Sequence, residues 1–201
     1  MKVFLRMVSY LFHPIFIPIA GTIAYFLVTP KYSPIELQSG NILPIFILTV
    51  IIPIIAYLIL TNIGVVSSVF QPNVKERRYP LYIITLLLLM VVYKVIPNNF
   101  TIELYYYFLG LISATTASLL LLFFGYKSSL HVTGMASLLM FLLCLSIHFE
   151  KNITIALCLF IVTTGVVATS RIYLKVHDRT EVFIGLIIGL FSQLLTVRYW
   201  L

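Results

Sequence analysis

Residues 42–62 read ILPIFILTVIIPIIAYLILTN, and this uncharged stretch decides the class of fold. A helix that crosses a bilayer needs about 20 mainly apolar residues, and this stretch has that length. An average soluble domain is roughly 25% charged, whereas this chain of 201 residues is 9% charged and 61% hydrophobic. So little polar surface cannot cover a soluble globule, and the composition equally excludes a disordered chain or a disulfide scaffold. The composition therefore predicts a polytopic membrane protein.

Six further apolar stretches complete the expected set of spans. We predict seven transmembrane helices, over residues 8–28, 42–62, 81–96, 104–126, 132–147, 153–169 and 182–197. Six is the alternative if residues 81–96 do not cross. Pro and Asn favour turns in the breaks at 29–34, 97–99 and 150–152, while prolines 14, 18, 44 and 53 are expected to kink their spans. Without an internal repeat or a linker, residues 1–201 are predicted to form a single all-α transmembrane bundle.

The polar residues concentrate in the loops that follow the even-numbered spans and precede the odd-numbered ones. If the spans alternate, the loops at 71–80, 127–131 and 170–181 share one membrane face. Of the 13 basic residues, nine belong to that face: Lys2, Arg6, Lys75, Arg77, Arg78, Lys127, Arg171, Lys175 and Arg179. Four belong to the other: Lys31, Lys94, Lys151 and Arg198. The positive-inside rule favours the cytoplasm for the richer face, but basic residues also bind phosphate, so charge alone does not fix the side. Nucleic acid is not expected as a partner, because no basic helix or stacking platform occurs.

Three clusters on this face carry residues suited to phosphoryl transfer. His177 and Glu181 are four apart, so on a helix the carboxylate can hold the imidazole in one tautomer; the adjacent Asp178 is a poorer partner. Ser129 can donate to a phosphoryl oxygen, and His131 can act as a general acid to a leaving oxygen. Cationic donors to phosphate complete the set: Arg171, Lys75, Arg77 and Arg78. Together these residues match phosphoryl transfer by a histidine nucleophile.

At these residues the chain resembles the type 2 phosphatidic acid phosphatase superfamily, which also includes haloperoxidases. Ser170-Arg171, His177 and Glu181 resemble its third signature, with Glu in place of the family's Asp. The segment Ser128-Ser129-Leu130-His131 is similar to the second signature, with Ser128 in place of Pro. The first signature, Lys, six residues and Arg-Pro, is matched loosely: Lys75 lies three residues before Arg78, and Tyr79 intervenes before Pro80. The matched stretch covers about half of the chain.

The resemblance implies an integral membrane lipid phosphatase that needs no metal or other cofactor. His177 would attack phosphorus to form a phosphohistidine, His131 would protonate the leaving oxygen, and Glu181 would orient His177. The phosphoryl oxygens would be held by Ser129, Arg171, Lys75, Arg77 and Arg78. Expected substrates are phosphatidic acid, phosphatidylglycerol phosphate or a polyprenyl diphosphate. Relatives in bacteria often work on the outer side of the inner membrane, which is the membrane expected for so compact a chain.

Several alternatives stay open from the sequence. An acceptor alcohol could intercept the same phosphohistidine, which would make the chain a lipid phosphotransferase. A degenerate scaffold that binds phospholipid is the non-enzymatic alternative, and a channel or transporter is a more distant one, since the charges cluster near span ends.

Other conspicuous residues receive structural interpretations. His13 and His148 are interpreted as structural, Cys144 and Cys158 as packing residues, and Gly185 with Gly189 as a close helix contact. The aromatic runs Tyr105–Tyr107 and Tyr199–Trp200 are interpreted as an interfacial belt.

Overall fold

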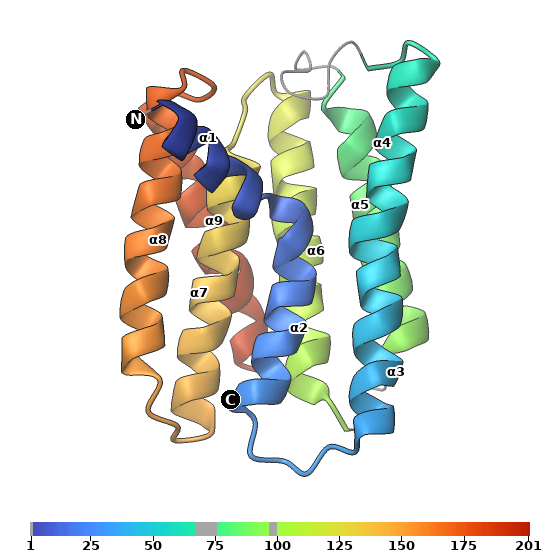
Figure 1. Cartoon of the computed structure of the whole chain (residues 1–201), viewed down its shortest axis with the longest axis vertical. Coiled ribbons are helices and arrows are strands. Elements are labelled where there is room, and N and C mark those ends of the chain that lie inside the picture. Colours follow the sequence, from blue (N-terminus) through green and yellow to red (C-terminus); the bar gives the residue numbers. More distant parts are fainter. Residues whose placement is uncertain (1, 67–75, 97–99) are drawn as a thin grey trace.

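The computed structural model describes residues 2–66, 76–96 and 100–201. Within these ranges all regular structure is helical, and seven segments are long and apolar enough to cross a membrane. Figure 1 shows these segments side by side in one upright bundle. The predicted all-α bundle of seven spans is confirmed, and the chain has the architecture of an integral membrane protein.

The seven spans are built from nine α-helices in the described ranges. These are α1 (Lys2–Leu11), α2 (Ile17–Val28), α3 (Ile35–Phe46), α4 (Ile52–Asn62), α5 (Arg78–Met90), α6 (Ile102–Phe123), α7 (Leu130–His148), α8 (Thr154–Tyr173) and α9 (Arg179–Val197). A 3₁₀ turn, η1 (Pro14–Phe16), joins α1 to α2. Two π-helical turns, η2 (Ile47–Ile51) and η3 (Val91–Val95), join α3 to α4 and extend α5.

The first span begins at Lys2, earlier than the predicted Val8, and it is broken at Pro14, where the sequence predicted a kink. A residue before proline is disfavoured in the α conformation, and His13 is accordingly extended, with φ −66° and ψ 137°. Pro14 then starts η1. Because of this break, α1 leans out of line with α2 and lies at a slant across one end of the bundle (Figure 1).

The second span begins at Ile35, earlier than the predicted Ile42. Its first turns contain Glu36, Gln38 and Asn41, which lower the local hydropathy but do not break the helix. Inside the span, Pro44 removes a backbone donor, and the helix widens into η2 directly after α3 ends. The expected disturbance at the proline therefore takes the form of a π-helical turn, a known response to an interrupted hydrogen-bond ladder.

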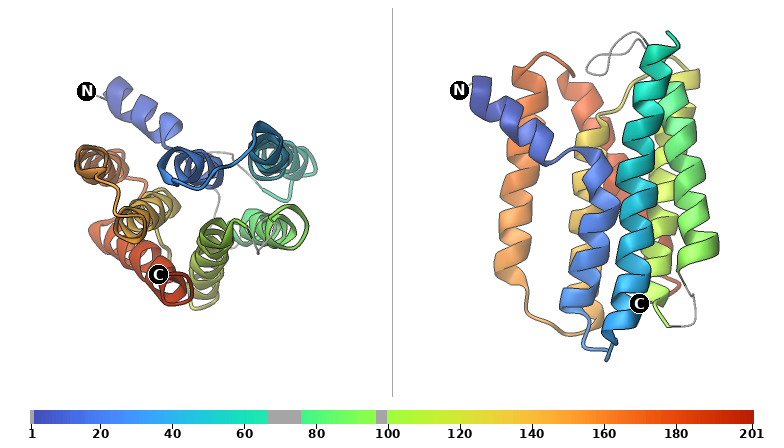
Figure 2. Two further views of the ribbon diagram at one scale, coloured as in Figure 1. Left: turned by 90° about the horizontal axis from the view of Figure 1, so that it is seen from below. Right: turned by 45° about the vertical axis from the view of Figure 1, so that its right-hand side comes forward.

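Helix α7 is the centre of the bundle and packs against α2, α6, α8 and α9; Figure 2 shows it from the end of the bundle. Its closest neighbour is α9. A Cβ added to Gly185 would lie 2.8 Å from the carbonyl oxygen of Ser129, and one added to Gly189 would collide with the carbonyl oxygen of Thr133. The predicted close helix contact at these two glycines is confirmed, and it brings the start of α9 against the start of α7.

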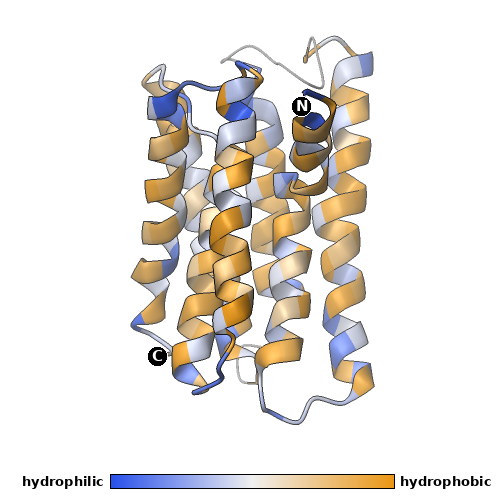
Figure 3. Cartoon of the chain, turned by 60° about the vertical axis from the view of Figure 1, so that its left-hand side comes forward, coloured by the Kyte–Doolittle hydropathy of each residue, from blue (hydrophilic) through white to orange (hydrophobic). Residues whose placement is uncertain are grey.

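Hydrophilic residues gather at the two ends of the bundle, while the length between them is mostly hydrophobic (Figure 3). At the end opposite to α1, the carboxylate of Glu103 is 1% exposed. It accepts hydrogen bonds from Tyr25 Oη (3.0 Å) and Lys31 Nζ (2.5 Å), and His148 Nε2 lies 3.4 Å away. These contacts tie α2, α6 and α7 together, so His148 has a structural environment.

The interpretation of the aromatic runs as an interfacial belt is wrong for two of their members. The Tyr107 ring is fully buried, stacks on Phe141 at 4.3 Å between centroids, and donates its hydroxyl proton to the carbonyl of Ile17. Trp200 is 8% exposed and packs edge-on against His148. These rings belong to the core because Tyr107 packs against α2 and α7, and Trp200 packs against α7.

Candidate active site

The third polar loop, residues 170–181, adopts the geometry that its spacing predicts. Asp178 is the N-cap of α9, and its carboxylate accepts the backbone N–H of Glu181 at 2.7 Å, as N-cap residues do. The helix therefore starts at Arg179, two residues after His177. Glu181 lies in its first turn, and its side chain points back toward the His177 ring. Glu181 Oε2 lies 2.6 Å from Nδ1 of His177. Asp178 thus caps the helix, and Glu181 is the partner of the imidazole.

This pairing fixes the chemistry of His177. A carboxylate accepts the proton of Nδ1, so in the neutral ring Nε2 carries the free lone pair. Burial lowers the pKa of His177 to about 4; the bond to Glu181 opposes this shift, and the positive charges of Arg77 and Arg171 add to it. The ring is therefore neutral at neutral pH, which is the form that a nucleophile requires.

The loop at residues 127–131 lies directly against the loop at residues 170–181. The backbone N–H of Ser129 donates to the carbonyl of Glu181 at 3.1 Å, which ties the start of α7 to α9. Ser129 is completely buried, yet its hydroxyl has no hydrogen-bond partner within the described residues. Ser128 donates instead to Ser118 Oγ at 3.2 Å, so neither serine caps α7 with its side chain. A buried, unpaired hydroxyl is uncommon in proteins, so the Ser129 hydroxyl calls for an explanation beyond packing.

Two of the predicted cations belong to this end of the bundle. Arg171 lies in the last turn of α8, and its charge acts on both His177 and His131. Its Nε is buried and has no hydrogen-bond partner in the described part of the chain. Arg77 interacts electrostatically with Glu181 and His177. These two guanidinium groups surround the imidazole with positive charge.

A third predicted cation, Arg78, is not brought to His177. Arg78 Nη2 donates to the carbonyl of Leu122 at 2.9 Å, and its guanidinium lies 4.5 Å from the centroid of the Phe123 ring. Arg78 therefore binds the end of α6. The charge of its neighbour Arg77, by contrast, acts on His177. Lys75 lies outside the described residues.

His131 lies in the first turn of α7 and is 9% exposed. Its Nε2 is 3.2 Å from the carbonyl oxygen of Ser9 in α1, and its ring meets that of His13 edge-on, with 5.1 Å between centroids. Neither Ser9 nor His13 was predicted as a site residue. Both lie in the first span, more than 100 residues from His131 along the chain, so no local spacing could reveal the contact.

An open pocket of about 490 Å³ adjoins His177. Besides His177, its charged lining consists of Lys127, Lys175, Asp178, Arg179 and Glu181. Lys175 has a left-handed backbone, with φ 56°, a conformation that costs a residue with a side chain about 1 kcal/mol. Glycine would adopt this backbone conformation without that cost. Lys175 instead adds positive charge to the pocket beside the His177 imidazole.

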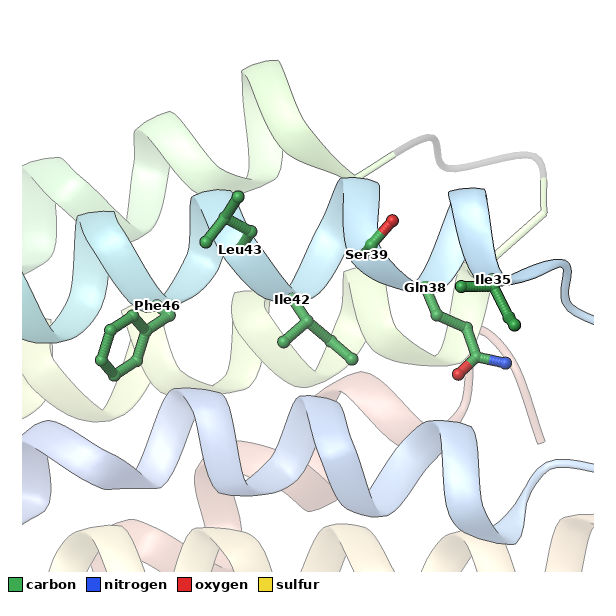
Figure 4. A pocket seen from close by; sticks show the side chains of 6 residues that line it. All are labelled: Ile35, Gln38, Ser39, Ile42, Leu43 and Phe46. Carbon is green, nitrogen blue, oxygen red and sulfur yellow. The ribbon is translucent and has the colours of Figure 1, made fainter.

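A second pocket of about 490 Å³ lies along α3, between Ile35 and Phe46 (Figure 4). It is lined by apolar residues with Gln38 and Ser39, and no titratable side chain lines it. The described residues also contain no group of three His, Cys, Asp or Glu side chains placed to hold a metal ion. The groups suited to chemistry therefore gather around His177 and His131.

Comparisons of the chain with protein-family models, with curated proteins and with solved structures gave no match. The resemblance to the type 2 phosphatidic acid phosphatase superfamily accordingly remains a prediction from the motifs.

Proposed function

We propose that the chain is an integral membrane lipid phosphatase that works through a phosphohistidine on His177. The observation that carries this proposal is the 2.6 Å pair of His177 Nδ1 with Glu181, close to a buried Ser129 hydroxyl that has no hydrogen-bond partner among the described residues. The pair leaves Nε2 as a nucleophile. The hydroxyl, with Arg171 and Arg77, supplies donors for the oxygens of a phosphoryl group.

In the proposed reaction, Nε2 of His177 attacks phosphorus and the bond to the lipid oxygen breaks. The leaving oxygen takes a proton from Nδ1 of His131, which enters this step as the imidazolium and keeps its Nε2–H on the Ser9 carbonyl. Water then attacks the phosphohistidine and gives its proton back to His131, and the P–N bond electrons return to Nε2. The products are a lipid alcohol and inorganic phosphate, or a lipid monophosphate if the substrate is a diphosphate. No step requires a metal ion.

Trapping of the intermediate tests this proposal. After rapid acid-free quenching with a ³²P-labelled lipid phosphate, the wild type should carry acid-labile label on His177, and His177→Asn should carry none. Label that persists in His177→Asn would refute the assigned nucleophile. Replacement of His148, which lies at the other end of α7 beside Glu103, is the matched histidine control and should leave the label in place.

The same intermediate would serve a phosphotransferase, which is the alternative activity. Product analysis with and without an acceptor alcohol separates the two. A phosphatase releases inorganic phosphate in both cases, whereas a transferase makes a phosphorylated acceptor at the expense of inorganic phosphate.

A further inference from the structure

The slanted helix α1 is bound to the candidate site through two buried serines. Ser170 Oγ lies 2.8 Å from the carbonyl oxygen of Leu5 and 2.8 Å from Ser9 Oγ. Since the single proton of Ser170 goes to the carbonyl, which can only accept, the Ser9 hydroxyl donates to Ser170. Ser170 is fully buried and Ser9 is 7% exposed. The two hydroxyls therefore form a clamp between α1 and the end of α8, next to Arg171.

The clamp places a backbone carbonyl against His131. The carbonyl oxygen of Ser9, 3.2 Å from His131 Nε2, can only accept, so Nε2 carries a proton. The remaining nitrogen, Nδ1, is then the one that exchanges a proton with a reacting oxygen. The charged or titratable groups that act on this ring are Arg171 from α8, His177 before α9 and His13 before η1. Among the contacts of His131 with the described residues, only the Ser9 carbonyl selects a tautomer.

Helix α1 is held by two buried apolar side chains, Leu5 and Val8, and by the two serines. It is only ten residues long, and an isolated helix of that length is marginal in water. Its buried residues are Leu5, Val8 and Ser9, while Val3, Phe4 and Met7 are exposed. Such an outward apolar face suits a helix that lies in the membrane interface, where lateral forces act on it. The hydrogen bonds of Ser170 supply the directional contacts that fix the Ser9 carbonyl on this side of α1.

We propose that α1 completes the candidate site, with Ser170 as a positioning residue that holds the Ser9 carbonyl against His131 and so fixes the tautomer and direction of that ring. Its effect on turnover rests on the proposed phosphatase function, whereas its effect on the ring itself does not. This role explains why a serine precedes Arg171. The Ser170 side chain contacts α1, while the charge of Arg171 acts on His177 and His131.

The tautomer of His131 can be measured without any substrate. We would incorporate ¹⁵N-imidazole histidine into the full chain in lipid nanodiscs and assign the His131 signals by their loss in His131→Gln. At a pH where the ring is neutral, the wild type should show Nε2 protonated and Nδ1 bare, and Ser170→Ala should show a mixture of both tautomers. The matched control is Ser137→Ala, which removes another buried hydroxyl of α7 that donates to a backbone carbonyl, that of Gly189 at 3.2 Å. An unchanged His131 spectrum in Ser170→Ala would overturn the proposal.

Kinetics on a lipid phosphate then test the consequence. Ser170→Ala should lower kcat about tenfold with less than about a twofold change in KM, because a general acid contributes at least that factor and its direction is what is lost. If Ser170→Ala does not fold, Ser9→Ala removes one hydroxyl and keeps the bond to Leu5, and should show a smaller loss of kcat. Full kcat in both variants would refute the positioning role. Absence of turnover by the wild type would instead refute the proposed function, and the tautomer comparison would still decide the role of Ser170.

Discussion

At the scale of single residues, the unpaired hydroxyl of Ser129 separates a role in binding from a role in folding. A buried polar group without a partner destabilises the fold, so its removal should not weaken it. We predict that Ser129→Ala leaves the free energy of unfolding unchanged or raises it by up to about 1 kcal/mol, while KM for a lipid phosphate rises about tenfold, the value of one good hydrogen bond to a charged group.

Ser128→Ala is the neighbouring control. This change breaks the bond to Ser118 and should cost about 1 kcal/mol of stability with little effect on KM. Thermal unfolding in detergent and initial-rate kinetics measure both quantities. A destabilised Ser129→Ala with unchanged KM would mean that the hydroxyl is structural.

The low pKa of His177 predicts the acid side of the pH profile. The neutral ring is the nucleophile, and a pKa of about 4 keeps it neutral as the pH falls from 7 to about 5. Because the positive charge of Arg77 helps to lower this pKa, Arg77→Gln should move the acid limb of kcat/KM to higher pH. Arg78→Gln should not move it, since Arg78 contacts Leu122 and Phe123 instead. Comparison of the two variants on one substrate cancels the ionisation of that substrate, and equal shifts in both would contradict the assignment of Arg77.

At the scale of helices, the contact of α7 with α9 supports the site from behind. A side chain at Gly189 would collide with the backbone of Thr133 and come within 2.7 Å of Ala136 Cβ. Gly189→Ala should therefore destabilise the protein by about 1–3 kcal/mol and reduce activity, because the start of α7 carries Ser129 and His131.

Gly165→Ala tests whether this effect is local. A Cβ at Gly165 in α8 meets no atom within 4 Å, so this change should be neutral or stabilise the helix by up to about 1 kcal/mol. Thermal unfolding of both variants measures the difference. Equal tolerance of alanine at both positions would contradict the close packing of α7 and α9.

The sequence predicted these helices well where one physical signal dominated. Apolar length located the seven spans, and the i, i+4 spacing located the pair of His177 and Glu181. It predicted a kink at Pro14 but not the full break of the first span there. It also missed the start of the second span, where a few polar residues lie inside a helix. Local hydropathy does not report backbone direction, so the slant of α1 could not be predicted.

At the scale of the whole molecule, alternation of the spans brings the polar loops of one face together. This argument correctly placed Ser129 beside Glu181. It could not choose between Arg77 and Arg78, because adjacent residues at the start of α5 point in different directions. It also missed Ser9 and His13, whose contacts with His131 depend on how α1 folds back over α7 and α8.

The excess of basic residues at the site end predicts its orientation. Under the positive-inside rule this end faces the cytoplasm, whereas the resemblance to bacterial relatives suggests the outer side. In a background with Cys144→Ala and Cys158→Ala, we expect Tyr126→Cys to react with an impermeant thiol reagent only in opened cells, and Lys151→Cys at the other end to react in intact ones. The reverse pattern would place the site outside.

Phosphate release from lipid phosphates is the measurement that tests the central claim most directly. The purified chain, reconstituted in EDTA, would be supplied with phosphatidic acid, phosphatidylglycerol phosphate and a polyprenyl diphosphate, in parallel with His177→Ala and His131→Ala. We predict metal-independent release from at least one substrate by the wild type, with a loss of 10²-fold or more in both variants, as expected for a nucleophile and its general acid. Equal release by His177→Ala and the wild type, or no release from any of these lipids, would contradict the account.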